Sequence, residues 1–217
     1  MHSNNGIICA VFDLDGTLVE SHKNIYNAAI HTFKKLDISY NMPEEDFYKY
    51  IGHHFEDIFE AFGIKVPDFE IFINEYKNIY FDYIDTSTLY KGVEDSLQLL
   101  KNKNIKIALL TTKGQDQAEK ILTHFKIDKY FDEIMGRRPG IAHKPSPEPL
   151  KLICNTLKVD PSKTLMIGDS ELDVQCGKNA GAKTCAVSYG YRTKELLQKE
   201  HPDYLIDNLS ELMCFFN

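Results

Sequence analysis

Residues 7–17, IICAVFDLDGT, decide the fold of this chain. The first six are apolar and rich in β-branched and aromatic types, which predicts a strand buried on both faces. This strand ends in two carboxylates, Asp13 and Asp15, followed by Gly16, which allows a sharp turn. Because buried paired carboxylates need a cationic partner, we expect a hard divalent ion such as Mg²⁺ here. The alternative is a solvated strand end at which Asp15-Gly16 only makes a turn.

Length and composition limit the classes of function. The chain has 217 residues, 43% of them hydrophobic, which suits one large domain or a domain with an insert. Its net charge of −7 provides no basic field for nucleic acid or an anionic membrane. No apolar stretch is long enough to span a membrane, and the first strand begins too close to Met1 for a secretory signal. We therefore expect a cytoplasmic protein that binds neither nucleic acid nor membranes.

The cysteines indicate a reducing environment. They are odd in number, show no C-x-x-C spacing, and several lie among apolar or small residues. We expect buried free thiols rather than disulfides or a zinc site. The five are Cys9, Cys154, Cys176, Cys185 and Cys214.

A helical segment follows Thr17. Apolar residues recur at helical spacing over residues 24–36, 55–62 and 68–83, and residues 41–45 carry a helix-start signal. No strand candidate interrupts residues 20–84. We expect residues 19–85 to form a second domain of about four helices, inserted into a core made of residues 1–18 and 86–217.

Strands and helices alternate from Thr88 onward. We expect strands at 105–110, 131–135, 164–167, 184–187 and 204–206, and helices at 93–100, 118–125, 148–157, 174–180 and the C-terminus. This alternation predicts right-handed βαβ units. The expected fold class is therefore α/β: a Rossmann-like parallel sheet with helices on both faces, plus the inserted helical bundle.

Four strand ends or nearby loops of this predicted sheet carry polar groups. These are Asp13 with Asp15, Thr111 with Thr112, Lys144, and Asp169 with Asp173. Because ligands of parallel α/β sheets bind beyond the carboxyl ends of the strands, we expect the groups to meet. Each has a simpler alternative: Thr111 as a local cap, Lys144 as a solvated side chain, and Asp169 or Ser170 as a helix cap.

The ordered motifs resemble the haloacid dehalogenase superfamily. They are DLDGT (13–17), Thr111 at the end of the next core strand, Lys144 within HKPSPEP (143–149), and GDSELD (168–173). More narrowly, the chain is similar to the phosphoglycolate phosphatase-like branch, which has a helical cap inserted after the first motif. The resemblance covers nearly the whole chain, through Gly92-Val93 and the Gly-Lys-Asn-Ala-Gly run at 177–181.

The resemblance implies a Mg²⁺-dependent phosphatase that forms an aspartyl-phosphate. Asp13 would be the nucleophile, and Asp15 would protonate the leaving oxygen and then deprotonate water. Thr111 would hydrogen-bond a phosphoryl oxygen, and Lys144 would neutralise charge on the nucleophile and the transferring group. The implied Mg²⁺ ligands are Asp13, the main-chain carbonyl of Asp15, Asp169 and, directly or through water, Asp173.

Some positions depart from the family pattern and others discriminate among its chemistries. Thr112 stands where this branch often has Asn, Glu20 where Asp is usual, and Lys91 where Pro is common; none removes a catalytic group. Dehalogenases of the superfamily lack a partner matching Asp15, so the resemblance disfavours carbon–halogen hydrolysis. Thr17 favours a phosphatase over a phosphomutase, in which Val is often found.

Residues outside the shared motifs would set the specificity. Gly52, His53 and His54 lie where relatives present a substrate-contacting loop, although His53 and His54 could equally be a solvated pair at a helix start. Arg137 and Arg138 lie between a strand and Lys144 and could grip a second anionic group or face solvent.

The expected substrate is a small phosphorylated metabolite: phosphoglycolate, a sugar phosphate, a nucleotide or pyrophosphate. The alternatives are a β-phosphoglucomutase-like phosphomutase and a non-catalytic protein that binds a phosphorylated ligand. We expect a monomer or a homodimer.

Overall fold

The computed structural model describes residues 6–216, which fall into two compact units. Residues 19–88 form the helical unit, and the described residues on either side of it form the sheet unit. The chain passes from one unit to the other between residues 18 and 19 and again between residues 88 and 89. The domain boundaries predicted from the sequence are 18/19 and 85/86. None of the described helices combines the length and apolar character that crossing a membrane requires.

The sheet unit is built on six parallel strands in the order β5-β4-β1-β6-β7-β8. Phe12 at the end of β1 pairs with Leu109 on β4 and with Ile167 on β6, so the carboxyl ends of β1 and β6 lie together, beside the middle of β4. The predicted α/β fold with a parallel sheet is confirmed. The strands are β1 (Cys9–Phe12), β4 (Lys106–Gly114), β5 (Glu133–Arg137), β6 (Thr164–Gly168), β7 (Lys183–Val187) and β8 (Tyr204–Ile206).

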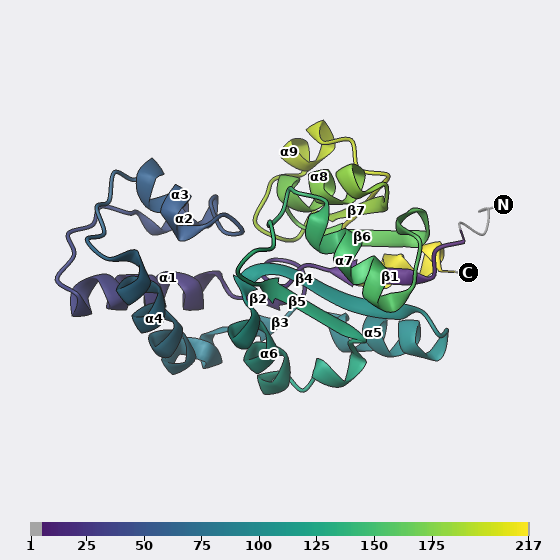
Figure 1. Cartoon of the computed structure of the whole chain (residues 1–217), viewed down its shortest axis with the longest axis horizontal. Coiled ribbons are helices and arrows are strands. Elements are labelled where there is room, and N and C mark those ends of the chain that lie inside the picture. Colours follow the sequence, from purple (N-terminus) through teal and green to yellow (C-terminus); the bar gives the residue numbers. More distant parts are fainter. Residues whose placement is uncertain (1–5, 217) are drawn as a thin grey trace. The chain divides into compact units, whose positions relative to one another are not determined.

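Helices cover both faces of this sheet. Figure 1 shows α5 (Val93–Asn102) and α6 (Gln115–His124) on one face, and α7 (Glu148–Leu157), α8 (Glu171–Ala180) and α9 (Lys194–Lys199) on the other. All four residues of β1 are buried because it lies in the middle of the sheet, as its continuous apolar run predicts. Cys9 and Val11 share one face and pack against residues of α7 and α8, including Leu150, Ile153 and Cys176.

Several expected elements differ in detail. Strand β4 continues past residue 110 to Gly114, with an irregular register between Leu110 and Gly114. Helix α9 is absent from the sequence expectations, because its six residues bury only Leu197 and carry no helical period. The expected C-terminal helix is a 3-10 helix, η4 (Leu209–Phe215).

The helical unit contains four α-helices in its described residues, as the sequence predicts. They are α1 (His22–Lys35), α2 (Glu44–Tyr48), α3 (Phe55–Ala61) and α4 (Phe69–Tyr80). Its core is aromatic: the Phe33 ring lies 5.1 Å from that of Phe59 and 5.0 Å from that of Phe72, measured between centroids. Phe33 and Phe72 are fully buried, so these rings pack within the unit rather than on its surface.

Two features of the helical unit correct the sequence expectation. The helix expected over 68–83 ends at Tyr80, and Tyr83 lies in a 3-10 helix, η1 (Phe81–Thr86). A two-stranded sheet, β2 (Val19–Glu20) with β3 (Thr88–Leu89), forms where the chain passes between the units. Strands of two residues are too short to show a period.

All five cysteines are free thiols. Four are buried as expected, whereas Cys214 is exposed.

Candidate active site

The candidate site begins at the carboxyl end of β1. Asp13 directly follows this strand, and its N–H donates to Ile167 O at 2.9 Å, so the hydrogen-bond ladder with β6 holds its backbone. The chain then turns back, with Gly16 at φ +86°. A Cβ on Gly16 would lie 2.3 Å from Asp169 Oδ2, so glycine is needed both for the backbone angle and for the close approach.

Two further carboxylates come from the turn between β6 and α8. Asp169 follows the last residue of β6, and Asp173 lies in the first turn of α8. One carboxylate oxygen from each of Asp13, Asp169 and Asp173 lies within 4.8 Å of the others, and all three residues are buried. A Cβ on Gly168 would be 2.1 Å from Asp173 Cγ, so the approach of this carboxylate also depends on a glycine.

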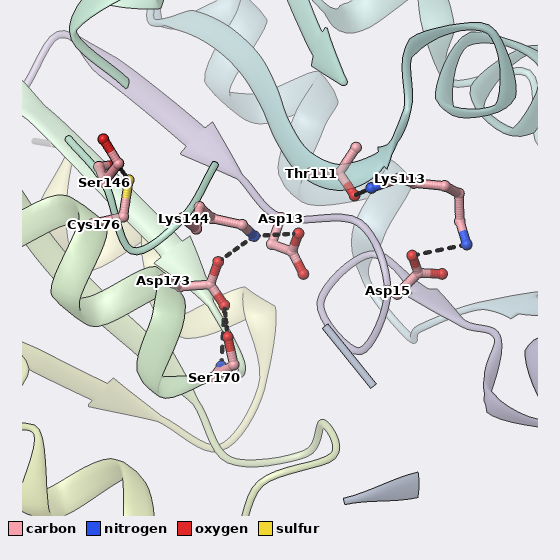
Figure 2. A network of polar contacts seen from close by, with 9 residues as sticks. All are labelled: Asp13, Asp15, Thr111, Lys113, Lys144, Ser146, Ser170, Asp173 and Cys176. Atoms are coloured by element: carbon pink, nitrogen blue, oxygen red, sulfur yellow. Dashed lines mark hydrogen bonds and ion pairs between the residues drawn. The ribbon is translucent and has the colours of Figure 1, made fainter. Parts of the chain in front are cut away.

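Lys144 joins two of these carboxylates, as Figure 2 shows. Its Nζ lies 2.7 Å from Asp13 Oδ1 and 2.6 Å from Asp173 Oδ1, and the residue is only 4% exposed. The other oxygen of Asp173 accepts hydrogen bonds from Ser170 Oγ at 2.6 Å and Ser170 N at 3.1 Å. Asp173 therefore caps the start of α8 and pairs with Lys144 at once, so a helix cap alone does not account for this turn. The alternative of a solvated Lys144 is wrong, because the residue is buried.

The electrostatics of this cluster indicate a need for more positive charge. Burial raises the pKa of Asp13 to about 7, against the opposing effect of Lys144. Burial and the neighbouring charge of Asp13 raise the pKa of Asp169 well above its ordinary value. Burial alone would lower the pKa of Lys144, but Asp13 and Asp173 outweigh it and raise that pKa. One ammonium cannot neutralise three buried carboxylates, and a set of hard oxygen donors suits a divalent cation such as Mg²⁺.

The opposite side of Asp13 carries Asp15 and residues of β4. Thr111 is buried on β4, two positions beyond the Leu109–Phe12 pair, and its Oγ1 accepts from the Lys113 N–H at 3.2 Å. Asp15 Oδ2 lies 3.1 Å from Lys113 Nζ. Sequence reasoning missed Lys113. Residues two apart in a strand share a face, so the predicted role of Thr111 is the signal that could have found it.

The loop after β7 also contacts the site and was not foreseen. The Tyr191 N–H donates to Asp169 Oδ2 at 2.7 Å, and the Tyr189 hydroxyl donates to Thr17 O at 2.9 Å. Arg192 pairs with Glu171 at the start of α8, at 2.8 and 3.2 Å. The Tyr191 contact uses the main chain, so no side-chain pattern could reveal it.

The remaining sequence candidates are divided between the two units. Gly52, His53 and His54 lie between α2 and α3 of the helical unit, where His54 directly precedes α3. Arg138 Nε donates to Gln115 Oε1 at 3.0 Å and its Nη2 donates to Ile134 O at 2.9 Å, so its guanidinium braces β5 and α6.

A small cavity lies beside the cluster in the sheet unit. It is lined by residues from β4, β5 and the loop before α7, including Arg137, Arg138, Thr111 and Lys144. Thr112, beside Thr111, is partly buried.

Comparison with known proteins agrees with this geometry. A family model for haloacid dehalogenase-like hydrolases matches residues 10–187, which include every motif of the candidate site. The chain belongs to this family. It is a haloacid dehalogenase-like phosphatase, and its cluster of aspartates could hold a metal ion.

Relatives match along almost the entire chain. A Clostridium perfringens protein, provisionally named pyrophosphatase PpaX, is 36% identical over 208 residues, covering 95% of this chain and 96% of that protein. Pyrophosphatase PpaX from Bacillus mycoides is 33% identical, covering 94% of each chain. The crystal structure of a predicted phosphoglycolate phosphatase from Haemophilus somnus superposes with a TM-score of 0.87 at 24% identity, covering 98% of this chain and 99% of that one. This last likeness concerns the fold.

Proposed function

We propose that this chain is a Mg²⁺-dependent phosphatase that hydrolyses a small phosphorylated metabolite through an aspartyl-phosphate, with pyrophosphate as the first candidate substrate. One observation carries the proposal: Asp13 is buried at a strand end, 2.7 Å from Lys144, within a cluster of three carboxylates. A protein that only binds a ligand has little use for such a concentration of negative charge. A nucleophilic carboxylate with a metal beside it uses that charge.

The metal would be held by Asp13, Asp169 and Asp173, with the main-chain carbonyl of Asp15 as a further ligand. When bound, Mg²⁺ supplies charge neutralisation, which allows a carboxylate and a phosphate dianion to approach. Gly16 and Gly168 support this role, because each lets backbone approach a carboxylate more closely than any side chain would allow.

The protein's own residues would act in sequence around the phosphorus atom. An oxygen of Asp13 attacks phosphorus, and the bond to the leaving oxygen breaks, giving the aspartyl-phosphate. Lys144 neutralises charge on Asp13 and on the transferring group, while Thr111 donates to a phosphoryl oxygen. Asp15 protonates an alcohol leaving group and then accepts a proton from the water that hydrolyses the intermediate.

The relatives' names favour pyrophosphate among the candidate substrates. The relatives from Clostridium perfringens and Bacillus mycoides described above are both named pyrophosphatases, the first provisionally, and they match this chain along most of its length. Pyrophosphate is a phosphoric anhydride rather than a monoester, so this candidate widens the reaction class expected from the motifs. Phosphoglycolate, sugar phosphates and nucleotides are the monoester candidates. The helical unit would act as a cap that excludes water, with Gly52, His53 and His54 as substrate contacts.

Phosphate release from a panel of these compounds tests the proposal. We expect release with Mg²⁺, none with EDTA, and none from Asp13→Asn, a substitution of nearly equal size that removes the nucleophile. Glu45→Gln, which removes an exposed carboxylate in the helical unit, is the matched control and should retain activity. Release that persists in EDTA or in Asp13→Asn contradicts the proposal. Isomerisation of glucose 1-phosphate without phosphate release would indicate a phosphomutase instead.

A further inference from the structure

A second buried lysine lies in the candidate site, opposite Lys144. Lys113 Nζ lies 3.1 Å from Asp15 Oδ2, and the two side chains are 7% and 11% exposed. In Figure 2, Lys144 lies on one side of Asp13 and the Lys113–Asp15 pair on the other. The family motifs contain Lys144 and Asp15 but leave Lys113 without a role.

The position of Lys113 is built into β4 and is not an accident of a flexible side chain. Its N–H donates to Thr111 Oγ1 at 3.2 Å, and it lies in the irregular end of β4, which continues to Gly114 beside β5. Burying an ammonium costs free energy unless nearby negative charge compensates. The Asp15 carboxylate supplies this negative charge.

The proposed function identifies what lies next to Asp15 during the reaction. Asp15 serves the leaving oxygen, so a cation that contacts Asp15 lies on the leaving-group side of phosphorus. A leaving group that carries its own negative charge, as phosphate or carboxylate, would gain from this cation. An uncharged leaving group would not.

We propose that Lys113 binds the charged leaving group of the substrate and so selects for compounds whose leaving group is anionic. This inference rests on the proposed function and deepens it. In the first step an Asp13 oxygen bonds to phosphorus, the bond from phosphorus to the bridging oxygen breaks, and its electron pair stays on that oxygen. With pyrophosphate the departing species is inorganic phosphate, which Lys113 stabilises. Water then cleaves the aspartyl-phosphate, Asp15 accepts its proton, and a second phosphate leaves.

The leaving group could carry its negative charge as a phosphate or as a carboxylate, and a choice of substrates distinguishes these two cases. Pyrophosphate releases phosphate, and 2-phosphoglycolate releases an alcohol that carries a carboxylate. The matched neutral substrate is 2-hydroxyethyl phosphate, which has a hydroxymethyl group in place of that carboxylate. A loss confined to pyrophosphate would assign a phosphate partner to Lys113, and a loss for both anionic compounds would assign any anionic leaving group.

The test measures kcat/KM for the three compounds in wild type, Lys113→Met, Lys113→Gln and Lys113→Arg. Loss of one charge-assisted contact should lower the ratio of kcat/KM for an anionic substrate to that for 2-hydroxyethyl phosphate by about tenfold or more in Lys113→Met and Lys113→Gln. Lys113→Arg retains the charge and should retain most of this ratio. Lys120→Met, which removes an exposed lysine from α6, is the matched control and should leave the ratio unchanged.

A purely structural role for Lys113 would lower all three values together. Equal losses on the charged and neutral substrates, in variants with wild-type circular dichroism, therefore overturn this inference alone. Wild-type protein that releases no phosphate from these three compounds or from any other member of the panel overturns the proposed function and the inference with it.

Discussion

Asp173 Oδ1 lies 2.6 Å from Lys144 Nζ, although the two residues are 29 positions apart in the chain. The second oxygen of the same carboxylate accepts two hydrogen bonds from Ser170 at the start of α8. One side chain thus ends a strand-to-helix turn, holds a buried lysine and stands beside Asp13. The helix cap and the charge balance of the candidate site are therefore coupled.

Replacing Asp173 by Asn should separate these roles. Asn keeps an oxygen that can cap α8, but it removes one negative charge from the cluster. We expect the apparent Mg²⁺ affinity to fall by about 10- to 100-fold, as is typical when a residue that supports a metal site is lost. The measurement is the Mg²⁺ dependence of phosphate release. Glu45→Gln, which removes an exposed carboxylate of the helical unit, is the control and should retain Mg²⁺ affinity. A wild-type affinity in Asp173→Asn would contradict the proposed metal site.

Replacing Lys144 by Met should destabilise the protein most strongly without metal. The change leaves Asp13 and Asp173 buried without their shared ammonium, and breaking a buried ion pair in this way costs about 3–5 kcal/mol. Mg²⁺ should restore part of the loss, because it supplies positive charge to the same carboxylates. Urea unfolding of wild type and Lys144→Met, each with Mg²⁺ and with EDTA, measures both effects. A loss that is the same with and without Mg²⁺ would show that the metal binds elsewhere.

Gly16→Ala should cost both stability and activity. Its φ of +86° disfavours any side chain, and the new Cβ would lie 2.3 Å from Asp169 Oδ2. Gly181→Ala is the matched control, because Gly181 has φ +83° and open space around its Cβ position. Both variants should lose about 1 kcal/mol of unfolding free energy from the backbone angle. Only Gly16→Ala should also lose phosphate release, and equal activity in the two variants would argue against close packing of this turn on Asp169.

The stabilising effect of Asp203 should disappear in acid. Burial works to raise its pKa, but Lys183 and the Thr184 N–H and hydroxyl outweigh burial and lower it. A carboxyl whose pKa is lower in the folded than in the unfolded chain adds stability above its unfolded pKa, which is about 3.9. That stability is lost as the pH falls through the folded pKa.

Asp203→Asn tests this expectation. The Asp203→Asn variant should have a lower free energy of unfolding than wild type at pH 7. The difference between the two proteins should shrink as the pH falls below about 4. Urea midpoints measured across this range are the test, and a difference that does not vary with pH would point to lost packing instead of lost charge.

Much of the fold could be predicted because its central strand carries a strong signal. The apolar run of β1 ends in Asp13, and a strand covered on both faces needs no alternation of polar residues. Helix α9 and the pair β2 and β3 could not be found, since such short elements have no period and depend on contacts distant in the chain. Strand β4 was predicted too short because its last residues, including Lys113, are polar.

The candidate site was predictable in its motifs and less so in its connections. Asp13 and Asp169 follow apolar strands, which marks them as strand ends, and parallel topology brings such ends together. The pairing of Lys144 with Asp173 depends on the path of a loop between β5 and α7, which no local pattern describes. The Tyr191 N–H that holds Asp169 is a main-chain contact, and it became visible only in three dimensions.

Trapping the covalent intermediate tests the central claim most directly. Acid quenching during turnover of pyrophosphate with Mg²⁺, followed by mass spectrometry of the digested protein, should find a phosphoryl group on the peptide that contains Asp13. Asp13→Asn should show neither this adduct nor phosphate release. Asp13→Asn protein that releases phosphate as fast as wild type would contradict the proposal that Asp13 is the nucleophile of this site.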